Sequence, residues 1–159
     1  ILGQAALLPA LALVLVAAAS LVLGMGLPVT ASYVVLATLA APALYDLITR
    51  SELIEMLAAG ALPESARAIF ALGAPDATLG APMSAAAASA LLAQMPPEMS
   101  SLLREAALSP ALLTTALLSA HMIVFWLSQD SNVTPPVCLT AFAAAGIAGT
   151  PPMRTGLVA

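Results

Sequence analysis

The sequence predicts an all-α membrane protein with a re-entrant helical hairpin, a discontinuous transmembrane helix and an amphipathic helical insert. Hydrophobic residues make up 62% of the chain and charged residues 8%, and the mean hydropathy is +1.06. A soluble domain carries about 25% charged residues, which help to cover its surface. Two interruptions of the apolar sequence define the hairpin and the discontinuous helix. A thin, alanine-rich soluble helical bundle is the alternative.

The charged residues divide the chain into regions. None of Asp, Glu, Lys, Arg and His occurs in residues 1–45, and only Asp130 and Arg154 carry charge after residue 118. Seven acids and three arginines lie between these apolar parts. We therefore expect the hairpin at 1–44, the insert at 45–109, the discontinuous helix at 110–149 and the start of a further helix at 150–159. The acidic excess argues against a nucleic-acid partner.

The first interruption lies at Gly24–Thr30, between apolar residues 5–23 and 31–44. Its two glycines suit the end of one helix, and Pro28 suits the start of the next. The second helix has about 14 residues, about 21 Å in length, which is shorter than a hydrocarbon core of about 30 Å. Together with the absence of charge in the turn, this length predicts a re-entrant hairpin. Two complete crossings are the alternative.

The insert reads as four short amphipathic helices, none of which is long or apolar enough to span a membrane. Their expected positions are Ser51–Gly60, Pro63–Gly73, a helix from Ser84 and a helix from Pro97. The pattern predicts a water-facing cap on the membrane part. A ligand-binding role is the alternative.

The second interruption, Ser128–Pro136, follows an apolar helix predicted from Pro110 and precedes another predicted at 137–148. Two prolines unwind the helix before them and leave main-chain carbonyls and amides free. Free carbonyls with hydroxyl and amide oxygens suit a small hard cation such as sodium, and the N-terminus of the restarted helix suits an anion. Broken helices of this kind are typical of secondary transporters. An aqueous loop between two ordinary spans is the alternative.

The remaining residues give no positive sign of an enzyme. The sequence has no nucleotide-binding loop, zinc-type histidine pair or nucleophile elbow, and the lone Cys138 excludes an intrachain disulfide. We interpret Cys138 and His121 as packing residues, the histidine with a hydrogen-bond partner. Arg154 is expected to face water. A membrane enzyme that uses His121 and Asp130 is the weakest alternative.

At the two interruptions the sequence resembles the large membrane subunit of tripartite ATP-independent periplasmic (TRAP) transporters, in the fused-permease branch that works with TAXI-type binding proteins. The matching residues are Leu23–Tyr33, Ala40–Leu44, Ala120–His121, Phe125–Pro136 and Ala141–Gly149, about a quarter of the chain. The resemblance implies an elevator-type, sodium-coupled importer of organic acids, chiefly carboxylates, in a bacterial inner membrane. Its partners would be a periplasmic solute-binding protein, membrane lipid and the rest of the permease chain, with sodium as coupling ion and no other cofactor.

The resemblance also implies site residues. The sodium ligands would be main-chain oxygens around Gly24, Gly26 and Asn132 and the hydroxyl of Thr134. The substrate contacts would be Thr30, Ser131 and Asn132. The residues that break the helices would be Pro28, Pro135 and Pro136.

Two departures from the family pattern limit what can be carried over. Many relatives have an Asp-Ser pair where this chain has Pro28-Val29, so no role for that acid transfers. The insert, which the family topology would make periplasmic, replaces a short link. A non-transporting structural subunit with proline-kinked helices is the alternative function.

Overall fold

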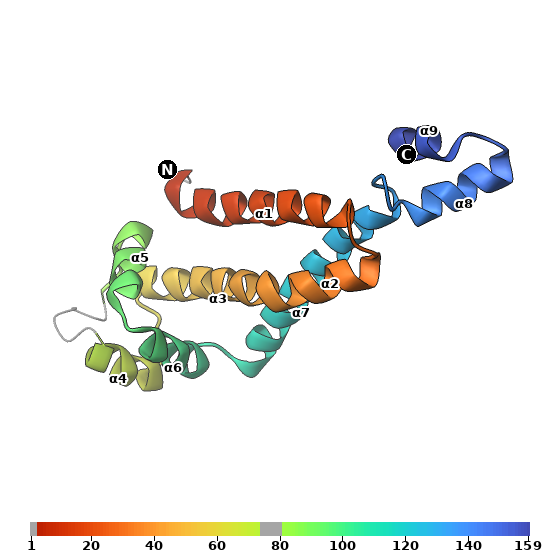
Figure 1. Ribbon diagram of the computed structural model, residues 1–159. Helices are drawn as coiled ribbons and strands as arrows, with labels where there is room; N and C mark the ends of the chain where they lie inside the picture. The colour runs from red at the N-terminus through yellow and green to blue at the C-terminus, as the bar shows by residue number, and fades with distance from the viewer. Residues whose placement is uncertain (1–2, 74–80) are drawn as a thin grey trace. The chain divides into compact units, whose positions relative to one another are not determined.

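The computed structural model describes residues 3–73 and 81–159, with only the main chain of residues 3–9 (Figure 1). Every element in these ranges is helical, which confirms the all-α prediction. The elements are α1 (Gly3–Gly24), α2 (Val29–Leu39), α3 (Ala41–Ala58), α4 (Glu64–Gly73), α5 (Ala85–Gln94), α6 (Pro97–Ala107), α7 (Pro110–Ser128), the 3₁₀ helix η1 (Gln129–Asn132), α8 (Leu139–Ala148) and α9 (Pro152–Val158).

One helical stretch of the described chain, Pro110–Asn132, is long and apolar enough to cross a membrane, with 23 residues. The helices α2 and α3 pass the same test only as a pair, and they are bent by 46° at the break between them. The sequence predicts a single helix over residues 31–44, so this bend is a difference. Its cause is Pro42, which lacks the N–H that would bond to the carbonyl of Thr38 and crowds that carbonyl with its ring.

The chain forms two compact units. The apolar unit comprises Leu7–Leu44 and Leu118–Ala159, and the amphipathic unit comprises Tyr45–Leu117 with the start of α1. Because α3 begins at Ala41, the boundary expected between hairpin and insert falls inside a continuous helix.

Within the apolar unit, α1 is tied to the end of α7 and α2 packs against η1. The Ser20 hydroxyl donates to the carbonyl of Leu127 at 2.7 Å. The Tyr33 hydroxyl lies 3.3 Å from Nδ1 of His121, and the Tyr33 ring meets that of Phe125 edge-on. His121 therefore has the hydrogen-bond partner that was predicted for it.

The helices α8 and α9 pack on each other after Gly149, whose φ of 65° ends α8 in the left-handed conformation that glycine adopts without strain. Gly156 of α9 lies over the Cys138 thiol so closely that a Cβ there would come within 2.6 Å of the sulfur. Cys138 is buried, as its predicted packing role requires.

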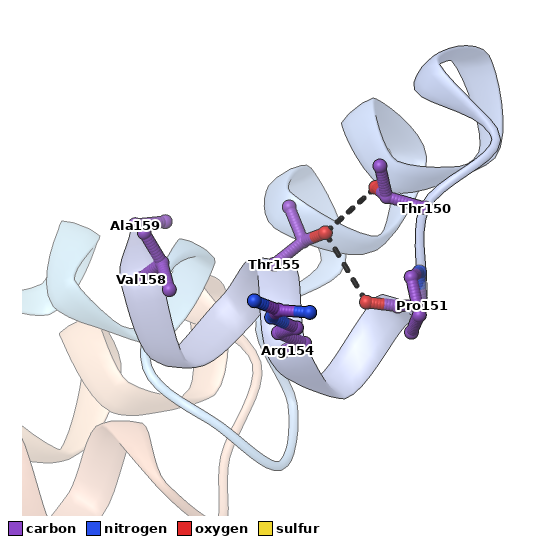
Figure 2. Close-up of a pocket in the computed structure, with 6 residues that line it drawn as sticks. All are labelled: Thr150, Pro151, Arg154, Thr155, Val158 and Ala159. Carbon is purple, nitrogen blue, oxygen red and sulfur yellow. Dashed lines mark hydrogen bonds between the residues drawn. The ribbon is translucent and has the colours of Figure 1, made fainter.

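A hollow of about 450 Å³ lies beside α9 (Figure 2). It is lined by Thr150, Pro151, Arg154, Thr155, Val158 and Ala159. The hydroxyls of Thr150 and Thr155 face each other at 2.9 Å, and the Thr155 hydroxyl also donates to the Pro151 carbonyl. Arg154 is exposed, as predicted, and none of the site residues predicted from the sequence lines this hollow.

The apolar unit buries serines as well as apolar side chains. Ser20, Ser32, Ser128 and Ser131 are each 0–2% exposed, and the buried apolar residues of the unit include Leu36, Leu44 and Val124. Many other large apolar side chains are turned outward, among them Val22 at 68%, Leu39 at 74% and Ile147 at 90% exposure.

The amphipathic unit is built around an apolar core. Leucines of α3 and α6, Phe70 of α4 and Leu92 of α5 form one apolar core. Most of its acidic residues are exposed; Glu52 is half-buried. The predicted helices after Pro63, Ser84 and Pro97 are present, and the Ser84 hydroxyl caps α5 by accepting from the amide of Ala87 at 3.2 Å.

The predicted helix start at Ser51 is wrong. Ser51 lies inside α3, where its hydroxyl donates to the carbonyl of Ile48 at 2.7 Å. A serine hydroxyl that bonds to its own helix in this way is compatible with a helix interior, although the same residue type favours caps. The predicted end of this helix is correct, since Gly60 follows it with φ of 68°.

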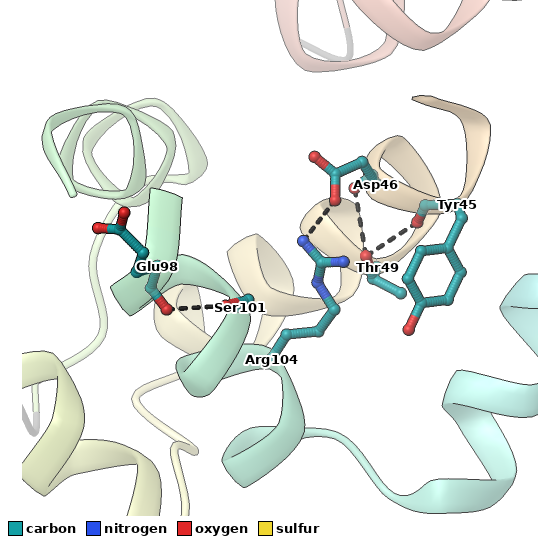
Figure 3. Close-up of polar contacts among 6 residues, drawn as sticks. All are labelled: Tyr45, Asp46, Thr49, Glu98, Ser101 and Arg104. Atoms are coloured by element: carbon teal, nitrogen blue, oxygen red, sulfur yellow. Dashed lines mark hydrogen bonds and ion pairs between the residues drawn. The ribbon is translucent and has the colours of Figure 1, made fainter. Parts of the chain in front are cut away.

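An arginine of α6 ties that helix to α3 (Figure 3). Arg104 forms an ion pair with Asp46, and its guanidinium carbon lies 5.2 Å from the centre of the Tyr45 ring. Because the Asp46 side chain is 65% exposed, the ion pair contributes at most about 1 kcal/mol. Its role is to fix orientation, while the apolar core supplies the stability.

We expect Phe70→Ala to destabilise the amphipathic unit by about 3–5 kcal/mol, because the ring is fully buried and its loss leaves a cavity. The measurement is hydrogen–deuterium exchange of the α4 and α6 amides. Leu72→Ala on the same helix is the matched control, since Leu72 is 79% exposed and its truncation should change stability by less than about 0.5 kcal/mol. Equal protection in the two variants would contradict this core.

Candidate functional site

The first interruption is a tight turn between α1 and α2, as predicted. The amides of Gly26 and Leu27 both donate to the carbonyl of Leu23, at 3.0 and 2.9 Å. Pro28 precedes α2 in an extended conformation, and no side chain caps this helix. Among the described residues, no donor reaches the carbonyls of Gly24 and Gly26 or pairs with the first three amides of α2. The turn therefore presents free carbonyls beside free amides.

The second interruption is the segment from η1 to Cys138, with α8 starting at Leu139 and not at the predicted Val137. Three donors converge on the carbonyl of Asp130: the amides of Val133 and Thr134 and, at 2.7 Å, the Thr134 hydroxyl. No described donor reaches the carbonyls of the following residues Asn132, Pro135 and Pro136. In the helix break, one carbonyl that accepts three hydrogen bonds is therefore followed by main-chain carbonyls that accept none.

The two interruptions lie against each other. A Cβ placed on Gly24 would be 3.2 Å from the main-chain nitrogen of Ser131 and 3.3 Å from its Cα, so any larger residue would crowd the main chain of Ser131. The packing of α2 on η1 and the hydrogen bond from Ser20 to Leu127 hold the same elements together. Residues more than 100 positions apart in the sequence therefore form one site.

The structure brings some of the predicted residues together and leaves others apart. Gly24 and Ser131 touch, and Ser131 is buried with its hydroxyl bonded to the carbonyl of Ser128 at 3.0 Å. Asn132 donates to the side chain of Gln129 at 3.1 Å. Gly26 and Thr30 are exposed, and Thr134 is half-buried. The breaking residues Pro28, Pro135 and Pro136 lie in the two interruptions, as predicted.

Sequence reasoning missed Ser32, which lies four residues after Pro28 on α2. Its side chain is fully buried, and its hydroxyl has no hydrogen-bond partner in the described chain. Nothing in the local pattern marks it, because a serine near a helix start is common on exposed surfaces as well. Its burial follows from the packing of α2.

The oxygens that the two interruptions offer are main-chain carbonyls and the hydroxyls of Ser131 and Thr134. The described residues contain no group of three or more His, Cys, Asp or Glu side chains that could hold a metal ion. Transition-metal chemistry requires such ligands. The arrangement instead suits reversible binding of a hard monovalent cation, with free helix amides for an anion.

We expect Gly24→Ala to destabilise the apolar unit by about 1–3 kcal/mol, because the added methyl group meets main-chain atoms that cannot rotate away. Gly26→Ala is the matched control in the same turn. A Cβ at Gly26 meets only the Leu23 carbonyl at 4.0 Å, and its φ is not positive. Thermal unfolding of the purified protein in detergent measures both, and equal melting temperatures would show that the close approach at Gly24 does not exist.

Comparison with known proteins adds no family assignment. No family model, curated protein or solved structure matches the chain.

Proposed function

We propose that the chain is the membrane permease component of a sodium-coupled secondary importer of organic acids. In this proposal a periplasmic binding protein delivers the carboxylate, and the apolar unit carries it across a bacterial inner membrane by an elevator-type movement. Residues 45–109, which lie within the amphipathic unit, are the water-facing insert on the periplasmic side. The resemblance of the turn and the break to TRAP permeases supports the transport function and its substrate class.

The outward apolar side chains of the apolar unit support a membrane location for it, because they cost free energy in water and none in lipid. Three of its four buried serines donate to main-chain carbonyls, as polar groups must where water is absent. The amphipathic unit, with its apolar core and exposed glutamates, has the surface of a water-facing part. The stretch Pro110–Asn132 would span about 34 Å as a helix, which matches a bilayer core with some tilt.

The contact between Gly24 and Ser131 is the observation that carries the transport proposal. It brings the turn and the break into contact, and in the proposal a cation binds free carbonyls of both segments. The Thr134 hydroxyl donates its hydrogen bond to the carbonyl of Asp130, so the lone pairs of its oxygen remain available to an ion. The uncapped amides at the start of α2, beside Thr30, suit a carboxylate.

The mechanism that follows is binding and release without covalent chemistry. Sodium draws the turn, through Gly24 and Gly26, toward Asn132 and Thr134 of the break. The carboxylate then completes the site at Thr30 and the uncapped amides of α2, beside Ser131. Only the filled site buries the main-chain groups of both interruptions, and this condition couples the ion gradient to uptake.

Trp126 is the single tryptophan of the chain and is 66% exposed. If the apolar unit lies in lipid, bromine atoms on phospholipid acyl chains should quench its fluorescence in reconstituted vesicles, and iodide in the water phase should not. The bromine position along the acyl chain that quenches most then gives the depth of Trp126. Quenching by iodide alone would place the apolar unit outside the bilayer and remove the basis of the proposal.

We expect Thr134→Ala to raise the sodium concentration needed for half-maximal uptake by about tenfold, a loss typical of single groups around a bound metal. Thr134→Ser keeps the hydroxyl and its bond to Asp130, so it should retain most of the affinity. The measurement is sodium-dependent uptake by the complete transporter, with membrane insertion checked separately. Unchanged sodium dependence in Thr134→Ala would favour a structural subunit with kinked helices.

A further inference from the structure

The hydroxyl of Ser32 is the only buried side-chain oxygen or nitrogen in the described chain that lacks a hydrogen-bond partner. A buried hydroxyl without a partner costs about 1–3 kcal/mol, and folded proteins rarely leave one so. Other hydroxyls in helices of this chain donate to a carbonyl one turn earlier. Thr38 donates to the carbonyl of Val34, and Thr49 donates to that of Tyr45. Ser32 makes no such bond, so its oxygen is available to something outside its own helix.

The packing of α2 indicates where the Ser32 side chain lies. Ser32 and Leu36, one turn apart, are the buried residues of α2. The helix contacts η1, and its Tyr33 contacts His121 and Phe125 of α7. Ser32 therefore lies in the part of the hairpin that packs beside the junction of Gly24 and Ser131.

The surroundings of this junction are rich in oxygen lone pairs and poor in free protons. The hydroxyls of Ser128 and Ser131 donate to the carbonyls of Phe125 and Ser128, at 2.7 and 3.0 Å. The Thr134 hydroxyl donates to the carbonyl of Asp130. With their protons committed, these oxygens offer lone pairs only. Hydroxyl oxygens of this kind can coordinate a cation.

We infer that the Ser32 hydroxyl is a ligand of a monovalent cation of sodium size, bound between α2 and η1. The ligands on both sides are neutral oxygens, and the described residues hold no cluster of carboxylates or imidazoles of the kind that divalent ions need. The inference rests on the proposed function and extends its cation site from the tip of the hairpin to the body of α2. Ion binding then orders the second helix of the hairpin along with the turn.

The test is thermal unfolding of the purified protein in detergent, with sodium chloride titrated against choline chloride at constant ionic strength. We expect the wild-type melting temperature to rise with sodium. Ser32→Ala should melt in choline at or above the wild-type temperature, because an unpaired buried hydroxyl has been removed. Its half-maximal sodium concentration should rise by about tenfold or more. Ser32→Cys keeps the side-chain volume but offers a soft sulfur, and it should lose sodium dependence to a similar degree.

Ser20→Ala is the matched control. Ser20 is equally buried in the same hairpin, but its hydroxyl is bonded to Leu127. Its removal should lower the melting temperature in choline and leave the response to sodium unchanged. A wild-type response that survives in Ser32→Ala would overturn the assignment of Ser32 alone. Absence of any sodium response in the wild type would overturn the proposed cation site together with this inference.

Discussion

The constraint on which the structure depends is the pairing of main-chain groups where its helices stop. Glycines and prolines end α1 and α7 early and leave carbonyls and amides without intrahelical partners. In water such groups are solvated, but in the interior of a protein or a membrane each one must find a partner. The contact of Gly24 with Ser131 brings the two interruptions together. The proposed site for an ion and an acid depends on this contact.

The surfaces of the two units differ. The amphipathic unit places leucines and Phe70 inside and its glutamates mostly outside, and it joins α6 to α3 through an arginine that lies between a carboxylate and an aromatic ring. The apolar unit buries four serines beside its apolar core residues and exposes many of its other large apolar side chains. A single composition average hides this difference. The charge map of the sequence separates the two parts, but only the structure assigns the inward and outward faces.

Local chemistry made much of the fold predictable. Gly60, Pro63, Ser84 and Pro97 act through their own conformational preferences, so the helix ends they define were correctly placed. The predicted helix start at Ser51 is wrong because a serine in a helix interior can form a hydrogen bond to its own helix as easily as a serine at a cap can. Pro42 was read as part of a continuing helix, although its missing N–H bends the chain there. Both errors arise because a serine or a proline can lie within a helical segment as well as at its start.

The site itself depends on contacts that no local pattern encodes. Periodicity locates the turn and the break separately, whereas the expectation that they meet came from the resemblance of their motifs to one family. Gly26 and Thr30 look equivalent to Gly24 and Ser131 in the sequence, yet they are exposed while the other pair is in contact. Ser32 is important only because packing removes it from solvent, and packing is a property of the whole unit.

The glycine over the cysteine in α9 has a practical consequence. With the Cys138 sulfur closed off by the main chain of Gly156, no alkylating or mercurial reagent can reach the thiol while α9 stays in place. The native cysteine is therefore expected not to react with thiol reagents added to the solution. Spectroscopic labels can be introduced at other positions of the chain without first replacing it, and the native packing beneath α9 is preserved in such studies.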